Sequence, residues 1–114
     1  MKIVKQGMEE IKCYQDNDLK EKHFIEICKE AKWLWELRTR EYIEKNGDVG
    51  ACVMGAGFNI WYLPPRARKP RKKMILRSPL ISQGSVTWEY SKYEIEQFFK
   101  KNEIDVYYTY GTID

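Results

Sequence analysis

The sequence predicts an α+β fold: a mainly antiparallel sheet with one long and one shorter helix. The middle of the first half has apolar residues at helical spacing, and short segments of alternating apolar and polar residues lie on both sides of it. Strands and helices do not alternate regularly, as they would in a doubly wound parallel sheet. With 114 residues, 43% of them hydrophobic and 32% charged, we expect a single domain over residues 1–114.

The N-terminal segment predicts two short strands. Met1–Lys5 and Glu10–Gln15 lie on either side of Gly7, and apolar residues alternate with charged ones in the second segment. Glycine adopts turn conformations without strain, so we expect the chain to reverse direction between these strands.

The long helix is expected to follow directly and to reach about Lys45. Asp18 and Glu21 have the spacing of a capping box, which begins a helix. Asn46 and Gly47 form a suitable end, because glycine adopts the left-handed conformation that closes many helices.

The chain after the long helix predicts three strands. Phe58–Leu63 is apolar on both sides, which is typical of a central strand with both faces covered. Pro64 and Pro65 end it, because proline cannot donate to a strand ladder. Met74–Leu76 and Ser85–Tyr90 predict two further strands.

The second helix is expected to begin at Ser91 and to end near Asn102. Ser91 and Glu94 form a capping-box pattern. A last strand follows, with apolar residues alternating over 104–110. The predicted order is therefore ββα, βββ, αβ, in a sandwich with the helices on one face of the sheet.

The long helix has a well-defined apolar face, and one arginine lies near its centre. Arg38 occupies a position where leucine would be expected. It therefore pairs with a carboxylate such as Glu89, extends to solvent near the helix end, or binds an anionic ligand. The residues of the apolar face are Phe24, Ile27, Cys28, Ala31, Leu34, Trp35 and Tyr42.

Trp33 and Leu37 lie on the opposite side of the same helix, flanked by Lys29 and Arg40. Three explanations are open: another layer of the chain covers them, a second copy of the protein covers them, or Trp33 stacks on a base beside Arg40. We favour self-association into a homo-oligomer through the long helix, because one sheet cannot cover both sides of a helix.

The positive charge of the chain is concentrated in one segment, residues 64–77. Seven of the 20 basic residues lie there without any acidic residue, and the other 13 are outnumbered by the 17 acidic ones. Such asymmetry indicates an anionic partner. The seven are Arg66, Arg68, Lys69, Arg71, Lys72, Lys73 and Arg77.

Residues 64–73 predict a basic hairpin loop that is stiffened by three prolines. Closely spaced lysine and arginine neutralise phosphates, so the expected ligand is nucleic acid or a phosphorylated small molecule. Trp61, Tyr62 and Trp88 would stack on bases if they face outward. Alternatively, the segment is a solvated surface or, in a eukaryotic cell, a nuclear import signal.

The cysteine pattern indicates a reducing compartment and no metal centre. Cys13, Cys28 and Cys52 are an odd number at wide spacings, and His23 is the one histidine of the sequence. No apolar run approaches the about 20 residues that span a bilayer. We therefore expect a cytoplasmic protein, or a nuclear one if the source is eukaryotic, without cofactor or membrane.

The sequence matches no common catalytic motif, which favours a binding protein over an enzyme. The glycines around Gly55 do not fit a dinucleotide-binding or phosphate-binding loop. A metal-dependent nuclease would use Asp48, Glu89 and Asp105, but their spacing does not favour it. A small hydrolase acting on a phosphorylated substrate, the third alternative, would need carboxylates to converge near the basic loop. We expect a non-enzymatic protein that binds a phosphate-rich ligand. The alternative is a protein-interaction or inhibitor module that acts through Trp33 and Leu37.

Overall fold

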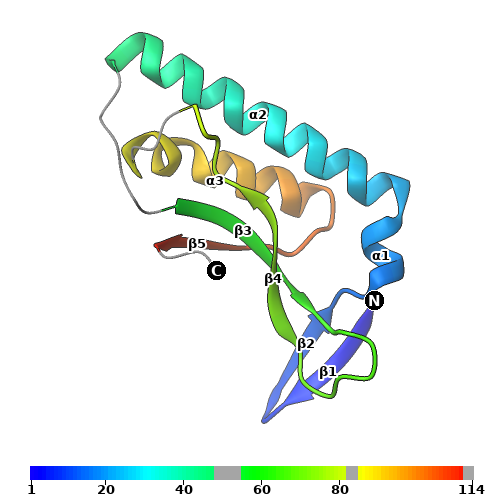
Figure 1. The fold of residues 1–114 in the computed structure, drawn as a ribbon. Coiled ribbons are helices and arrows are strands. Elements are labelled where there is room, and N and C mark those ends of the chain that lie inside the picture. The colour runs from blue at the N-terminus through cyan, green and yellow to red at the C-terminus, as the bar shows by residue number, and fades with distance from the viewer. Residues whose placement is uncertain (48–54, 82–84, 112–114) are drawn as a thin grey trace.

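The computed structural model describes residues 1–47, 55–81 and 85–111, and its mixed helices and antiparallel sheets confirm the α+β class. The long and the shorter helix are both present (Figure 1). In chain order the elements are β1 (Lys2–Gln6), β2 (Glu9–Cys13), α1 (Asp16–Lys20), α2 (Lys22–Asn46), β3 (Gly55–Tyr62), β4 (Arg71–Arg77), α3 (Ser85–Lys101) and β5 (Tyr107–Gly111).

The strands form two antiparallel sheets. The larger has the order β4-β3-β5, so the strand predicted to be central is central, and β1 pairs with β2 in a separate hairpin. Two backbone hydrogen bonds attach the hairpin to the end of β3: Tyr14 N donates to Trp61 O at 2.8 Å, and Leu63 N donates to Tyr14 O at 2.9 Å. The hairpin therefore continues from one end of the larger sheet (Figure 1).

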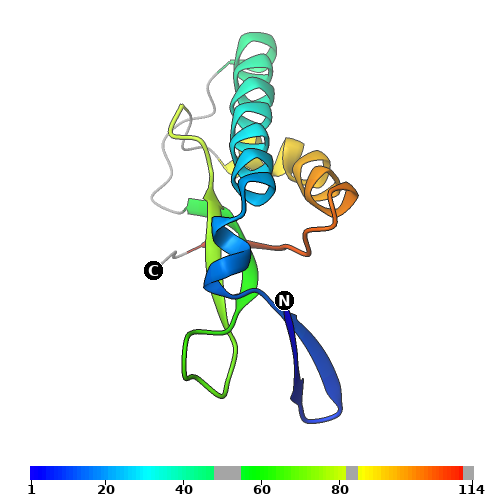
Figure 2. The same ribbon diagram turned by 90° about the vertical axis from the view of Figure 1, so that its right-hand side faces the viewer.

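Both long helices lie on one side of the larger sheet, as predicted. α3 packs on β3 and β5, whereas α2 packs on α3 and on β4 (Figures 1 and 2). The face of the larger sheet opposite these helices is called the outer face below.

Phe58 stands at the centre of the core between the helices and the sheet. Its ring centroid lies 5.3 Å from that of Trp35 on α2, 5.7 Å from Phe99 on α3 and 5.4 Å from Tyr108 on β5. The predicted apolar face of α2 is confirmed at Phe24, Ile27, Ala31 and Trp35, which are buried, and Cys28 and Leu34 pack against this cluster.

Only the C-terminal end of α2 agrees with the sequence prediction. The helix closes at Gly47, as expected, and the Gly47 amide donates to Ile43 O at 2.7 Å. The φ of Gly47 is positive, 80°, but its ψ of 165° differs from the predicted left-handed cap. At the other end, Asp18 belongs to α1 and α2 begins only at Lys22. The Asp18 carboxylate accepts hydrogen bonds from Gln15 N at 2.8 Å and from the N-terminal ammonium at 3.0 Å.

The strand predicted at Ser85–Tyr90 is wrong: these residues form the first part of α3. β-branched and aromatic residues favour strands intrinsically, but tertiary packing overrides that preference here. Thr87 and Trp88 are adjacent and both buried, which a strand with one covered face does not allow. Ser91 is accordingly not a helix cap; it lies inside α3, buried on the same side as Ile95.

Candidate nucleic-acid interface on the outer sheet face

The basic segment is divided between a loop and a strand. Arg66, Arg68 and Lys69 lie in the connection after β3, but β4 begins at Arg71, so the predicted loop at 64–73 ends three residues earlier than expected. All seven basic residues of the segment are exposed. No ion pair joins any of them to a carboxylate within the described ranges 1–47, 55–81 and 85–111.

The connection before β4 contains a tight turn. Ala67 N donates to Pro64 O at 3.1 Å, and Arg66 has a φ of 64°, in the left-handed region that few non-glycine residues adopt. Pro70 is buried at the start of β4, which anchors the end of the turn. The turn therefore holds its exposed cations away from the core.

The alternation of side chains along β4 separates neighbouring lysines. Lys72 is opposite Trp61 in the register of β3 and β4, and Lys73 is opposite Ile60. Because successive strand residues point to opposite faces, Lys72 lies on the outer face and Lys73 on the helix side. Buried Ile60 marks the helix side independently.

An aromatic pair lies next to Lys72 on the outer face. Trp61 on β3 and Tyr107 on β5 meet edge to face with ring centroids 5.9 Å apart. The Lys72 ammonium lies 5.7 Å from the centroid of Trp61 and 5.6 Å from that of Tyr107. Trp61 is half-buried, Tyr107 is 41% exposed and Lys72 is exposed. We call these three residues the aromatic–lysine cluster.

The other two aromatic residues expected to stack on bases face inward. Tyr62 is buried on the helix side, and its hydroxyl donates to the Asp16 carboxylate, which raises the pKa of Tyr62. Trp88 is buried in α3, and its Nε1 donates to Pro79 O at 3.3 Å. Neither ring is available to a ligand.

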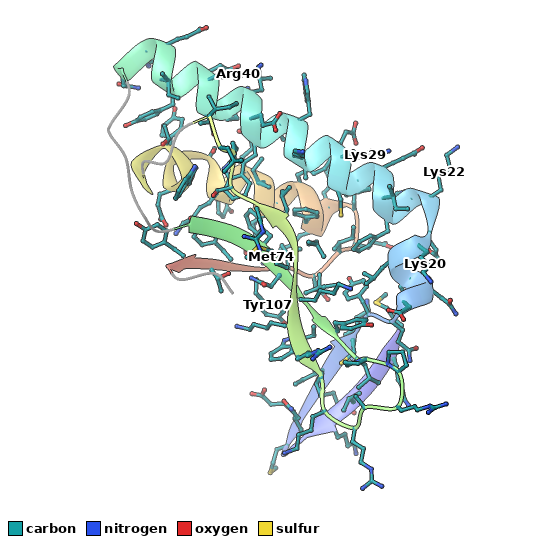
Figure 3. The ribbon with its side chains drawn as sticks, in the orientation of Figure 1. Lys20, Lys22, Lys29, Arg40, Met74 and Tyr107 are labelled. Atoms are coloured by element: carbon teal, nitrogen blue, oxygen red, sulfur yellow. The ribbon has the colours of Figure 1, made fainter. Side chains whose placement is uncertain are left out.

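A second row of residues crosses the outer face beside the cluster. Asn59 is opposite Met74 on β4 and Tyr107 on β5, and its Nδ2 donates to Thr109 Oγ1 at 2.6 Å. Met74 lies over Gly57, where an added Cβ would come within 2.7 Å of the Met74 methyl carbon. Figure 3 labels Met74 on β4 and Tyr107 on β5, the strands on either side of β3. The side chains of this row are uncharged.

Arg38 pairs with two carboxylates rather than joining the basic segment. Its Nε lies 2.8 Å from Glu94 Oε1 on α3, and a terminal nitrogen lies 3.0 Å from Glu41 Oε2 on its own helix. The hydrogen bonds to Glu94 raise the pKa of Arg38. Glu89, the partner considered in the sequence, lies 2.7 Å from Lys92 Nζ instead. Arg38 therefore links α2 to α3.

The residues expected to mediate self-association lie on α2 and differ in exposure. Trp33 is 62% exposed, Leu37 is half-buried and Arg40 is exposed. Figure 3 places Lys29 and Arg40 on the same helix. A hollow of about 450 Å³ beside Trp33 includes His23, Ile27 and Glu30 in its lining.

Two of the three cysteines lie in the described part of the chain, and both are at least partly shielded from solvent. Cys13 is buried and Cys28 half-buried, and burial raises the pKa of both thiols, to about 11 for Cys28. Cys52 and Asp48 lie outside the described residues. In the described part of the chain, no three His, Cys, Asp or Glu side chains come together as metal ligands, and no helix is long and apolar enough to cross a membrane.

Comparisons with known protein families, curated proteins and solved structures found no match. Function is therefore inferred from the residues of this chain alone. In the aromatic–lysine cluster, a half-buried and an exposed ring from two strands have their centroids 5.7 Å and 5.6 Å from one exposed ammonium group. Tyr107 was not singled out in the sequence, because its place beside Trp61 depends on the pairing of β3 with β5.

Proposed function

We propose that this protein is a non-enzymatic binding protein for single-stranded nucleic acid, which it holds on the outer face of its larger sheet. The observation that carries the proposal is the aromatic–lysine cluster of Trp61, Tyr107 and Lys72. Two rings and a cation from three adjacent strands meet there, at the end of the sheet where the basic turn begins.

The rings supply the contact with bases. Stacking of a base on an exposed aromatic ring contributes about 1–3 kcal/mol and tolerates any sequence. The Lys72 ammonium that now lies over the rings is suited to a phosphate between two stacked nucleotides. Bases within a duplex are stacked on one another and cannot reach a ring on a sheet, so single strands fit this surface better.

The basic turn supplies the contact with phosphates. Arg66, Arg68 and Lys69 are exposed in the connection between the strands that carry Trp61 and Lys72, and Arg71 begins the second of these strands. Each phosphate that such a cation neutralises releases counterions, which makes binding stronger at low salt. A phosphorylated small ligand would use the same cations but would need fewer of them.

The test measures the fluorescence anisotropy of labelled oligonucleotides, as single strands of DNA and RNA and as a duplex. Wild-type protein should bind the single strands more tightly than the duplex. Tyr107→Leu keeps an apolar side chain but removes a ring, and should weaken single-strand binding about tenfold, equivalent to about 1.4 kcal/mol.

The control is Tyr93→Leu, which removes a 70% exposed tyrosine from α3 and should leave binding unchanged. Equal loss in both variants, or no binding by the wild type at low salt, would contradict the proposal.

We also propose that the protein associates with itself through Trp33 and Leu37. The observation that favours this is the 62% exposure of Trp33 in the middle of the well-formed helix α2. Burying such a ring in an assembly releases about 25 cal/mol per Å² of apolar surface before association costs. Light scattering should show a dimer for the wild type and a monomer for Trp33→Glu. A monomeric wild type at high concentration removes this proposal and leaves the nucleic-acid proposal standing.

A further inference from the structure

A groove runs between α2 and the edge of the larger sheet, on the side of β4 opposite the aromatic–lysine cluster. Its first part has a volume of about 420 Å³, with a largely apolar floor that includes Phe24, Ile25, Cys28, Ile75 and Leu76. Ile25 remains 40% exposed there. The groove is therefore an apolar surface that the described part of the chain leaves open.

A second hollow of about 670 Å³ continues the groove toward the end of β4. It shares Lys32, Ile75 and Leu76 with the first and adds the segment from Ser78 to Ile81. Leu80 in this segment is 90% exposed. The two hollows together extend from Lys73 on β4 to Ile81, four residues beyond the end of that strand.

The strand beside the groove has a free edge. In the described residues β4 pairs with β3 alone, so the backbone groups on its other side are open to a further strand. Exposed edges of this kind accept an extended peptide, which contributes backbone hydrogen bonds while its alternate side chains enter pockets. The groove and the free edge are adjacent. One extended segment can therefore pair with β4 and place its side chains in the groove.

The positive charge of the groove favours an acidic partner. Lys29 and Lys32 on α2 and Lys73 and Arg77 on β4 are among the residues that line the two hollows, and Glu36 is the one acidic residue of this lining. All four cations are exposed. A basic segment would be repelled here, whereas acidic side chains would be attracted from both sides.

We propose that this groove binds an extended acidic segment of a partner protein, which adds as a strand to the free edge of β4 and places its apolar side chains in the groove. The inference does not rest on the proposed nucleic-acid function. Lys73 lines the groove, whereas Lys72 lies on the outer face. Substituting one lysine at a time therefore tests each site separately.

The probe is a fluorescent peptide of about eight residues, enough to follow one strand, in which glutamate alternates with valine or leucine. A matched peptide carries N-methyl groups on alternate residues, which removes backbone donors and keeps the side chains. The wild type should bind the first peptide and not the second. Lys29→Gln, Lys32→Gln and Lys73→Gln combined should weaken binding at least about fivefold, and Lys72→Gln should leave it within about twofold.

Three results would overturn the inference. No change of anisotropy with the alternating peptide shows that the groove does not accept such a segment. Equal binding of the N-methylated peptide shows that no strand is added. A triple variant that loses oligonucleotide binding and keeps peptide binding assigns these lysines to nucleic acid. Circular dichroism melting confirms that the triple variant is folded, as expected for three exposed positions.

Discussion

Lys72 and Lys73 are neighbours in the chain, yet their ammonium groups lie over aromatic rings on opposite faces of one sheet. Lys72 lies over Trp61 and Tyr107 on the outer face, whereas Lys73 lies 4.4 Å from the centroid of Tyr62 on the helix side. The alternation of a β-strand produces this division. A run of three basic residues that resembles one patch in the sequence therefore belongs to two surfaces.

The first prediction compares the two lysines in oligonucleotide binding. Lys72→Gln should weaken binding to a single strand and reduce the log–log slope of affinity against salt by about 0.7, the value for one lost phosphate contact. Lys73→Gln removes the same charge one residue away and should leave the slope nearly unchanged. Titrations at several salt concentrations make the comparison. Equal slopes for the two variants would show that only the total charge matters.

The second prediction concerns Ser91, whose hydroxyl is buried and has no hydrogen-bond partner among the described residues. Ser91→Ala should raise the free energy of unfolding by about 1 kcal/mol, because it removes an unsatisfied polar group from a helix interior. Denaturant unfolding measures the change.

The matched control for Ser91 is Ser78→Ala. The Ser78 hydroxyl accepts a hydrogen bond from Ala56 N at 3.3 Å, so the same substitution should lower the free energy of unfolding by about 1 kcal/mol. If Ser91→Ala also destabilises the protein, the Ser91 hydroxyl makes a stabilising hydrogen bond in solution and the prediction is wrong.

The third prediction concerns the link between α2 and α3 through Arg38. Arg38→Leu should lower the melting temperature, and Glu94→Gln should have a smaller effect once Arg38 is gone, because the two residues interact directly. A double-mutant cycle measures this coupling. Added salt should reduce it, since both side chains reach solvent. Strictly additive effects of the two substitutions would show that the pair contributes nothing.

The fourth prediction concerns the reactivity of Cys28. Burial raises its pKa to about 11, so at pH 8 about one thiol in a thousand is ionised and alkylation by iodoacetamide should be slow. The rate should rise steeply up to about pH 11. Because the pKa of Cys28 is higher in the folded than in the unfolded protein, the unfolded protein loses this proton first. The free energy of unfolding should therefore fall as the pH rises through the same range.

The experiment on Cys28 uses a Cys52→Ser variant and mass spectrometry to assign the label. Protein unfolded in urea serves as the control and should react at the rate of an ordinary thiol. Rapid alkylation of the folded variant at pH 8 would mean that Cys28 is not shielded.

Local signals predicted most of the fold. The apolar periodicity of α2, the glycine that closes it at Gly47 and the doubly apolar β3 each act within a few residues, and each is confirmed. Ser85–Tyr90 failed because its residues favour strands locally, while the burial of both Thr87 and Trp88 is decided by the helix they join. Propensity is a weak guide where packing disagrees with it.

The candidate sites were harder to predict from the sequence than the fold. The charge of the basic segment was visible, and so was the aromatic character of Trp61. The face on which Trp61 lies depends on the register with β4, and the partnership with Tyr107 depends on a pairing between distant strands. The groove beside β4 needs α1, α2 and β4 in place at once, and no local pattern signals it.

The pairing of β3 with β5 also affects how the protein reaches its native state. Asn59 contacts Tyr107 across 48 residues of chain, whereas β4 follows β3 after one short connection. Closing the longer loop costs more entropy, so the β3–β4 hairpin should form first and β5 should join late. The aromatic–lysine cluster draws on all three strands. Partly folded molecules therefore lack it, and a ligand of this surface would distinguish chains that have finished folding from those that have not.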